Sequence, residues 1–198
     1  MTRIKIIGLA LAAVFALSAA TAASASAAHF EASESSNLLA KVVTGASGEQ
    51  VFTTKAGKVV CKALKVKAGK STAGKVETQL ATISYENCTA FGLTATISEA
   101  EYLFHAGTTP GTGTVDVEKA ITIKAAGCEV KVPAQKGLGK ITYKNVGGKE
   151  VELVPNVTGI TSSGTGFACT YASESSGTYV GNSLVSLEGG GEIKWTEL

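Results

Sequence analysis

The chain has 198 residues, of which 18 are basic, 16 acidic and 44% hydrophobic, and its formal net charge is +2. This near balance provides no global attraction to nucleic acid, and the single arginine, Arg3, leaves almost no capacity for bidentate phosphate binding. Nucleic acid is therefore excluded as a partner. The 23 glycines follow no regular spacing, which also excludes a collagen-like fibre.

The N-terminus has the layout of an export signal. Arg3 and Lys5 form a short cationic segment, residues 6–20 carry no charge, and small residues follow as far as Ala28. A signal peptidase recognises this order of regions, and an apolar run of about 15 residues is shorter than the roughly 20 that a spanning helix needs. We expect cleavage after Ala27 or Ala28, with an uncleaved anchor as the alternative. The mature protein is then secreted or held at the cell surface, with no membrane span.

The leader, residues 1–27, accounts for the whole net charge. The mature chain, residues 28–198, keeps 16 lysines against 16 acidic residues. These charges are unevenly spread, because residues 28–75 hold eight lysines and three acidic residues, whereas residues 76–198 hold eight lysines and 13 acidic residues. The basic segment is densest at Lys55, Lys58, Lys62, Lys65, Lys67 and Lys70.

Two interpretations of these six lysines stay open. As a binding patch, they could hold an anionic cell-wall or extracellular polymer through weak, salt-sensitive contacts. As a structural device, lysines at exposed strand positions block edge-to-edge aggregation, and we favour this second interpretation. Aromatic platforms that stack bases are missing there apart from Phe52, which again argues against nucleic acid.

Apolar and polar residues alternate with a period of two through most of the mature chain. The alternation is clearest in residues 91–98, 121–124, 128–132 and 141–144. Because successive strand side chains face opposite sides, this pattern predicts strands with one buried and one solvated face, as in antiparallel sheets. In residues 91–98 the buried set is Phe91, Leu93, Ala95 and Ile97. Residues 58–67 and 76–85 fit strands less cleanly.

Turn signals rich in glycine and serine separate these runs, and no mature segment has convincing helical periodicity. The sequence therefore predicts an all-β fold, an antiparallel β-sandwich or barrel-like architecture of ten or more short strands. We expect residues 28–198 to form one domain. Similar lysine-rich contexts around Cys61 and Cys128 leave open a division into two β modules near residue 110.

Four cysteines in an exported chain indicate disulfides rather than a metal or redox site. None lies in a CxxC motif, and only two histidines are present. Four cysteines allow three connectivities. We favour Cys61–Cys88 and Cys128–Cys169, because sequential pairing matches the possible two-module organisation.

Catalytic candidates are few, and no catalytic residue, cofactor or metal site is predicted. His105 could act as a base, with Asp116 orienting it and a serine attacking, but no GxSxG motif marks a nucleophile. Glu99 and Glu101 would share one face of a strand, as paired carboxylates do, although glycosidase carboxylates normally come from distant strands. Solvated surface residues explain both groups more simply, and we expect a protein that is not an enzyme.

Aromatic residues offer a different binding chemistry. Tyr143, Tyr171 and Tyr179 are candidates for exposed stacking against sugars, although the sequence does not show that they cluster. The single tryptophan, Trp195, follows three glycines near the C-terminus. We expect it to pack against, or to close, a last strand.

The second half of the chain carries loose motifs of a known kind. These are residues 126–135 around Cys128, residues 141–145, residues 156–160, and a Gly/Ser loop before Cys169. With them, residues 58–182 resemble uncharacterised exported β-rich proteins of high-GC Gram-positive bacteria. Members of that group carry a further cysteine pair, whereas here Ala100 precedes Glu101 and Tyr102. The resemblance implies a secreted or cell-surface β protein and supplies no activity.

Together these features predict a secreted or cell-envelope-associated, non-enzymatic β protein with a structural or binding role. One alternative is a carbohydrate-binding or adhesion module for an extracellular polymer. Another is an exported hydrolase whose site the sequence does not reveal.

The export signal makes a direct prediction. Intact-mass measurement of the secreted protein should find the leader removed after Ala27 or Ala28. An exported form that retains residues 1–20 would contradict the prediction.

Overall fold

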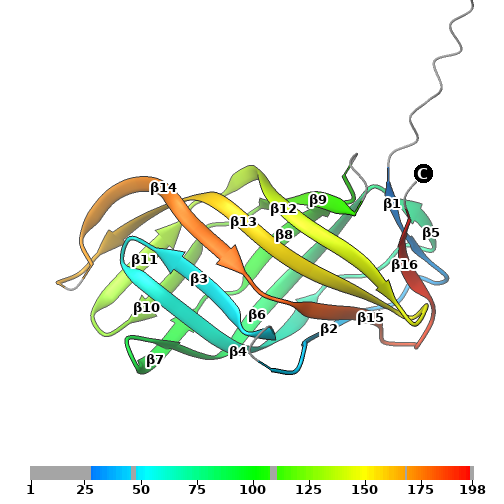
Figure 1. Cartoon of the computed structure of the whole chain (residues 1–198), viewed down its shortest axis with the longest axis horizontal. Coiled ribbons are helices and arrows are strands. Elements are labelled where there is room, and N and C mark those ends of the chain that lie inside the picture. Colours follow the sequence, from blue (N-terminus) through cyan, green and yellow to red (C-terminus); the bar gives the residue numbers. More distant parts are fainter. Residues whose placement is uncertain (1–27, 46–47, 108–110, 168, 197–198) are drawn as a thin grey trace, which may run out of the picture.

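The computed structural model describes residues 28–45, 48–107, 111–167 and 169–196 (Figure 1). The predicted leader lies outside these residues. The first strands are β1 (His29–Ala32), β2 (Leu38–Val42), β3 (Gln50–Thr54), β4 (Gly57–Ala68), β5 (Gly74–Val76), β6 (Thr78–Ala90), β7 (Leu93–Ile97) and β8 (Ala100–His105). The remaining strands are β9 (Thr112–Val117), β10 (Ile121–Ala125), β11 (Cys128–Val132), β12 (Gln135–Val146), β13 (Glu150–Thr165), β14 (Tyr171–Val180), β15 (Ser183–Leu187) and β16 (Ile193–Thr196). The all-β prediction is confirmed.

Two antiparallel rings, one after the other along the long axis, wrap the large sheet into a barrel (Figure 1). The first ring runs β13-β14-β3-β4-β6-β7-β10-β11 and returns to β13 where Val130 pairs with Gly164. The second runs β4-β6-β8-β9-β12-β13-β15-β2 and comes back beside β4. The long strands β4, β6 and β13 belong to both rings, so strands from before and after residue 110 contribute to each ring. No helix among the described residues is long and apolar enough to span a membrane.

A small sheet, β16-β1-β5, covers one end of the barrel (Figure 1). Trp195 on β16 is buried, its indole Nε1 donates to the carbonyl of Ala106 at 3.0 Å, and its ring stacks on Tyr143. Phe30 on β1 meets the same Tyr143 ring edge-on. The side chain of Asn145 bonds both the N–H and the carbonyl of Trp195. The expectation that Trp195 packs within a last strand is confirmed, and its role is to close the barrel end.

The two strands that fitted the alternation least, β4 and β6, lie next to each other and change phase together. The buried positions of β6 are odd-numbered as far as Tyr85 and even-numbered from Cys88, and Asn87 between them has a φ of 53°. On β4 the buried positions change from Cys61 to Leu64 opposite this point, where Cys61 pairs with Cys88. Both strands change phase at the same place. The ladder between β4 and β6 therefore continues there, although the period-two burial pattern of each strand is interrupted.

The predicted buried face of residues 91–98 is wrong at one end. Phe91 and Leu93 are 61% and 55% exposed, whereas Ala95 is buried. Phe91 lies in the turn between β6 and β7 with a φ of 54°, so its side chain leaves the strand alternation. Its ring covers Gly57, where an added Cβ would lie 2.7 Å from the ring. The apolar residue Phe91 thus belongs to a turn that covers the neighbouring hairpin, and it is not part of a buried strand face.

Both favoured disulfides are present. Cys61–Cys88 joins β4 to β6, and Cys128–Cys169 joins the start of β11 to the segment that precedes β14. The second bridge lies in the first ring, at the end of the barrel opposite the small sheet.

Loss of the second bridge should destabilise the protein strongly. It closes a loop with a sequence separation of 41 residues, and the chain-entropy model makes that worth about 4 kcal/mol. Urea unfolding of a Cys128→Ala/Cys169→Ala variant should show that loss, with Cys61→Ala/Cys88→Ala as a comparison of similar size. An unchanged unfolding midpoint after full reduction of the natural protein would argue against these staples.

Candidate functional site

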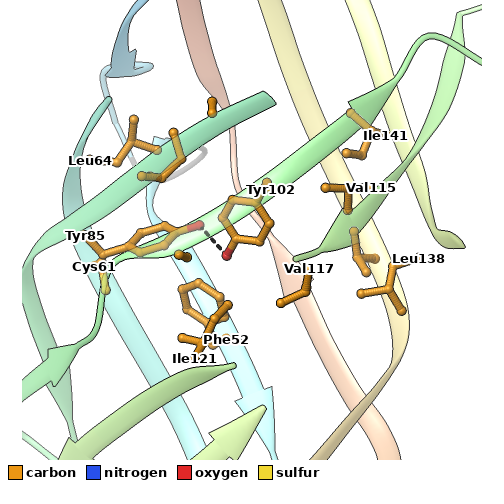
Figure 2. Packing of buried hydrophobic residues seen from close by; sticks show 14 of the residues in the cluster. Phe52, Cys61, Leu64, Tyr85, Tyr102, Val115, Val117, Ile121, Leu138 and Ile141 are labelled. Carbon is orange, nitrogen blue, oxygen red and sulfur yellow. Dashed lines mark hydrogen bonds between the residues drawn. The ribbon is translucent and has the colours of Figure 1, made fainter. Parts of the chain in front are cut away.

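The barrel encloses an apolar cavity of about 120 Å³. Side chains from both rings surround it, among them Leu64, Val66, Val115, Val117, Leu138 and Ile141. Figure 2 shows Val115, Val117, Leu138 and Ile141 on one side of the interior, facing the rings of Tyr85 and Tyr102. Protein interiors normally contain few voids larger than a water molecule. A cavity of this volume is therefore unusual for a protein interior.

An empty cavity of this size is costly. At about 24 cal/mol per Å³ of residual cavity, 120 Å³ corresponds to about 3 kcal/mol. A typical domain has only about 5 to 15 kcal/mol of net stability. Water is a poor occupant of this cavity, because a buried water molecule needs polar partners and the cavity wall is almost wholly apolar. An apolar occupant would recover the lost contacts.

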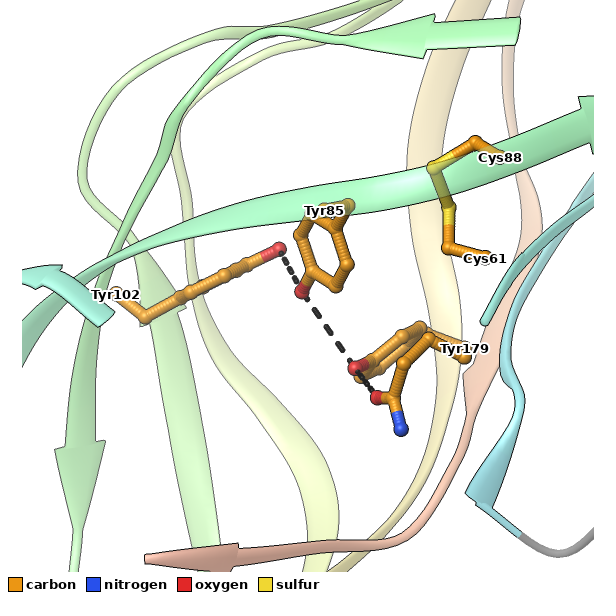
Figure 3. Close-up of a disulfide and its surroundings, with 6 residues drawn as sticks. Cys61, Tyr85, Cys88, Tyr102 and Tyr179 are labelled. Carbon is orange, nitrogen blue, oxygen red and sulfur yellow. Dashed lines mark hydrogen bonds between the residues drawn. A yellow bond between two sulfur atoms is a disulfide. The ribbon is translucent and has the colours of Figure 1, made fainter. Parts of the chain in front are cut away.

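Three tyrosines and one glutamine of the interior form a hydrogen-bonded chain. The hydroxyl groups of Tyr102 and Tyr85 are 3.0 Å apart, and the Tyr85 hydroxyl donates to that of Tyr179 at 3.5 Å (Figure 3). Tyr179 in turn donates to the side-chain oxygen of Gln50. The Gln50 amide nitrogen donates to the carbonyl of Gly48 at 2.8 Å. The chain satisfies the buried phenols mutually.

Burial controls the ionisation of these phenols. It raises the pKa of Tyr102 to about 12. Burial also raises the pKa of Tyr85, Tyr179 and Tyr143. Neighbouring phenols raise that of Tyr85 further, because one phenolate would repel a second. The interior therefore offers neutral hydroxyl groups and no charge, which suits an uncharged apolar molecule.

The six lysines of the predicted patch all lie exposed on or beside β4. Lys58, Lys62, Lys65 and Lys67 belong to the strand itself, Lys55 precedes it, and Lys70 follows it. Lys55 is paired with Glu174 at 3.2 Å and Lys65 with Glu86 at 2.9 Å. Within the described part of the chain, the other four have no carboxylate within ion-pair distance. The patch is thus one strand's outer face with four unpaired cations.

The structure brings His105 and Asp116 together. The imidazole Nε2 of His105 lies 3.2 Å from the carboxylate of the buried Asp116, which also accepts a hydrogen bond from the N–H of Gly137 at 2.7 Å. Burial raises the pKa of Asp116, but the hydrogen bonds from Gly137 and His105 and the charge of nearby Lys136 outweigh it and lower that pKa. No serine hydroxyl is bonded to His105 among residues 28–45, 48–107, 111–167 and 169–196. The pair joins β8 to β9 and the start of β12.

The predicted carboxylate pair has one acidic neighbour across the sheet, because the N–H of Glu118 donates to the carbonyl of Glu101 at 2.9 Å. Glu101 is bonded to Lys119 at 2.7 Å, and Glu99 is an exposed residue between β7 and β8. No cluster of three or more potential metal-ligating side chains occurs in the part of the chain that the structure describes. The carboxylate of Glu101 is thus held in an ion pair at the surface of the sheet.

The tyrosines proposed for sugar stacking do not share an exposed face. Tyr143 is buried against Trp195, Tyr179 stacks on Phe52 inside the barrel, and Tyr171 bonds Ser162. Sequence reasoning missed the interior residues Tyr85, Tyr102 and Gln50. The sequence contained a weak indication of them, because each is a polar residue at a strand position that the alternation assigns to the buried face.

Alkaline pH should test the phenol chain. A raised pKa means that the unfolded state releases its proton first, so stability is complete below pH 10 and falls as the pH rises through 10 toward 12. Each such tyrosine contributes a slope of about 1.4 kcal/mol per pH unit. Urea unfolding at pH 9 to 12 should show a shallower decline in Tyr102→Phe than in the natural protein. Equal slopes, with phenolate absorbance appearing at pH 10 in the folded state, would refute the burial of Tyr102.

Comparisons with known proteins give no family for this chain: no protein-family model, no curated protein and no solved structure matches it.

Proposed function

We propose that this chain is a secreted, non-enzymatic binding protein that holds a small apolar molecule inside its barrel. The observation that carries the proposal is the cavity of about 120 Å³, whose wall is apolar apart from a few hydroxyl and amide groups. Binding sites for small molecules are typically apolar hollows with few, well-placed polar groups. An engineered apolar cavity of about 150 Å³ in another protein stays dry and binds benzene or xenon.

The covalent structure is compatible with an exported role. Two disulfides, Cys61–Cys88 and Cys128–Cys169, suit an oxidising compartment. The small sheet carrying Trp195 closes one end of the barrel. We also propose secretion or attachment to the cell envelope, which the predicted leader supports.

The two alternative functions draw less support. A carbohydrate-binding module needs exposed aromatic platforms, and Tyr143, Tyr179 and Trp195 point inward instead. A hydrolase needs a nucleophile or a second acid, and the His105–Asp116 pair has neither a serine nor another carboxylate bonded to it in the described ranges.

Thermal unfolding with neutral apolar probes tests the proposal. Benzene and octanol should both stabilise the protein, since a ligand at 100 times its dissociation constant adds about 2.7 kcal/mol. For a domain of this size that corresponds to a melting temperature about 5 to 10 °C higher.

A cavity-filling variant provides the control. Ala81 lines the cavity from β6, so Ala81→Leu should fill part of it, reduce the probe effect by half or more, and cost little stability on its own. Thr89→Leu, on the exposed side of the same strand, should leave the probe effect intact. Absence of any shift, together with a loss of about 1 to 3 kcal/mol in Ala81→Leu, would indicate a filled core and overturn the proposal.

A further inference from the structure

The wall of the barrel has a seam beside the cavity. Among the described residues, β2 forms a ladder only with β15, and residues 63–68 of β4 form one only with β6. The strands β2 and β4 nevertheless lie side by side. The backbone N–H of Leu38 donates to the carbonyl of Gly69 at 3.0 Å at one end of this seam. Along the rest of the seam, side chains and not a backbone ladder close the second ring.

Backbone groups line the seam. Leu38 N–H faces β4, and in an antiparallel strand the groups two and four residues further on face the same way. The N–H and carbonyl groups of Ala40 and Val42 therefore point toward β4, which offers them no ladder. These backbone groups can therefore hydrogen-bond a ligand's head group at the part of the wall that has no ladder.

The seam lies directly over the cavity. Ala40 on β2 and Leu64 and Val66 on β4 border it, and all three also line the cavity. Ala40 is the smallest of these side chains, so little bulk separates the interior from the solvent at this point. Separation of β2 from residues 63–68 of β4 would break no ladder between them.

The outer rim of the seam carries unpaired positive charge. Lys62 and Lys67 are exposed on β4, and within the described part of the chain neither has a carboxylate within ion-pair distance. Lys41 on β2 is bonded to Glu150 at 2.7 Å, and Lys65 is bonded to Glu86. A lysine ammonium group has three donors and no acceptor. The rim thus favours an anion at the surface, above an interior that favours alkyl groups.

We infer that the ligand is a single-chain alkyl carboxylate, with its chain in the cavity and its carboxylate at the β2–β4 seam, between Lys67 on the seam and Lys62 just before it, whose Cα atoms lie about 16 Å apart along β4. This inference rests on the proposed function. The cavity accommodates a chain of about six carbon atoms, by comparison with the six of benzene in a cavity of similar size. A carboxylate that remains in the seam keeps its hydration, which avoids the large cost of burying an unpaired charge.

Calorimetric titration with octanoate, octanol and octylamine at pH 7 and low salt separates the head group from the chain. Octanoate should bind most tightly, and Lys62→Gln/Lys67→Gln should weaken it by about three- to tenfold while leaving octanol unchanged. Raising the salt to 0.5 M should remove most of the octanoate advantage. Charge reversal, Lys62→Glu/Lys67→Glu, should make octylamine bind more tightly than octanoate.

The matched control is Lys140→Gln/Lys149→Gln, which removes the same charge from exposed lysines on β12 and the turn after it. This control should bind octanoate like the natural protein. Equal weakening in both double variants, or octanol binding as tightly as octanoate, would overturn the seam site while leaving the apolar cavity intact. Failure of all three compounds to bind would overturn the proposed function itself.

Discussion

The hydrogen-bonded chain Tyr102–Tyr85–Tyr179–Gln50 links four nearby strands of the barrel wall through its interior. Tyr85 and Tyr102 come from the paired strands β6 and β8, whereas Tyr179 and Gln50 come from β14 and β3. Buried hydroxyl groups must find partners, because each unsatisfied one costs about 1 to 3 kcal/mol. These satisfy one another, and their strands are thereby tied together beside the apolar cavity that Tyr85, Tyr102 and Tyr179 also line.

The two rings of the barrel close differently. The first closes fully through backbone ladders, whereas the last two strands of the second, β2 and β4, meet without a ladder. The phase change at Asn87 and Cys61–Cys88 lies on β6 and β4, the strands shared by the two rings. Cavity, seam and unpaired lysines are therefore parts of one arrangement.

The sequence predicts the elements of this fold better than their assembly. Period-two alternation identifies the strands around Ile121, Cys128 and Ile141, and the even cysteine count leads to the two disulfides. The prediction fails where the backbone leaves the period, as at Asn87 on β6, and where an apolar residue covers a turn, as Phe91 covers Gly57. Both depend on backbone angles and on neighbours far away in the sequence.

The candidate site was less accessible to sequence reasoning. Tyr143 and Tyr179 are as consistent with an exposed sugar platform as with a barrel interior until the ring of strands closes. A cavity is a property of what side chains fail to fill, and no local pattern encodes it. The lysines of β4 were identifiable, but their position beside a seam follows only from the absence of a ladder between β2 and β4.

Diffraction from a crystal pressurised with xenon tests the central claim most directly, because xenon binds apolar voids without needing polar partners. The account predicts anomalous density inside the barrel, between the phenol rings of Tyr85 and Tyr102 and the side chains of Val115 and Leu138. A xenon-free interior in which these side chains meet and fill the space would contradict it.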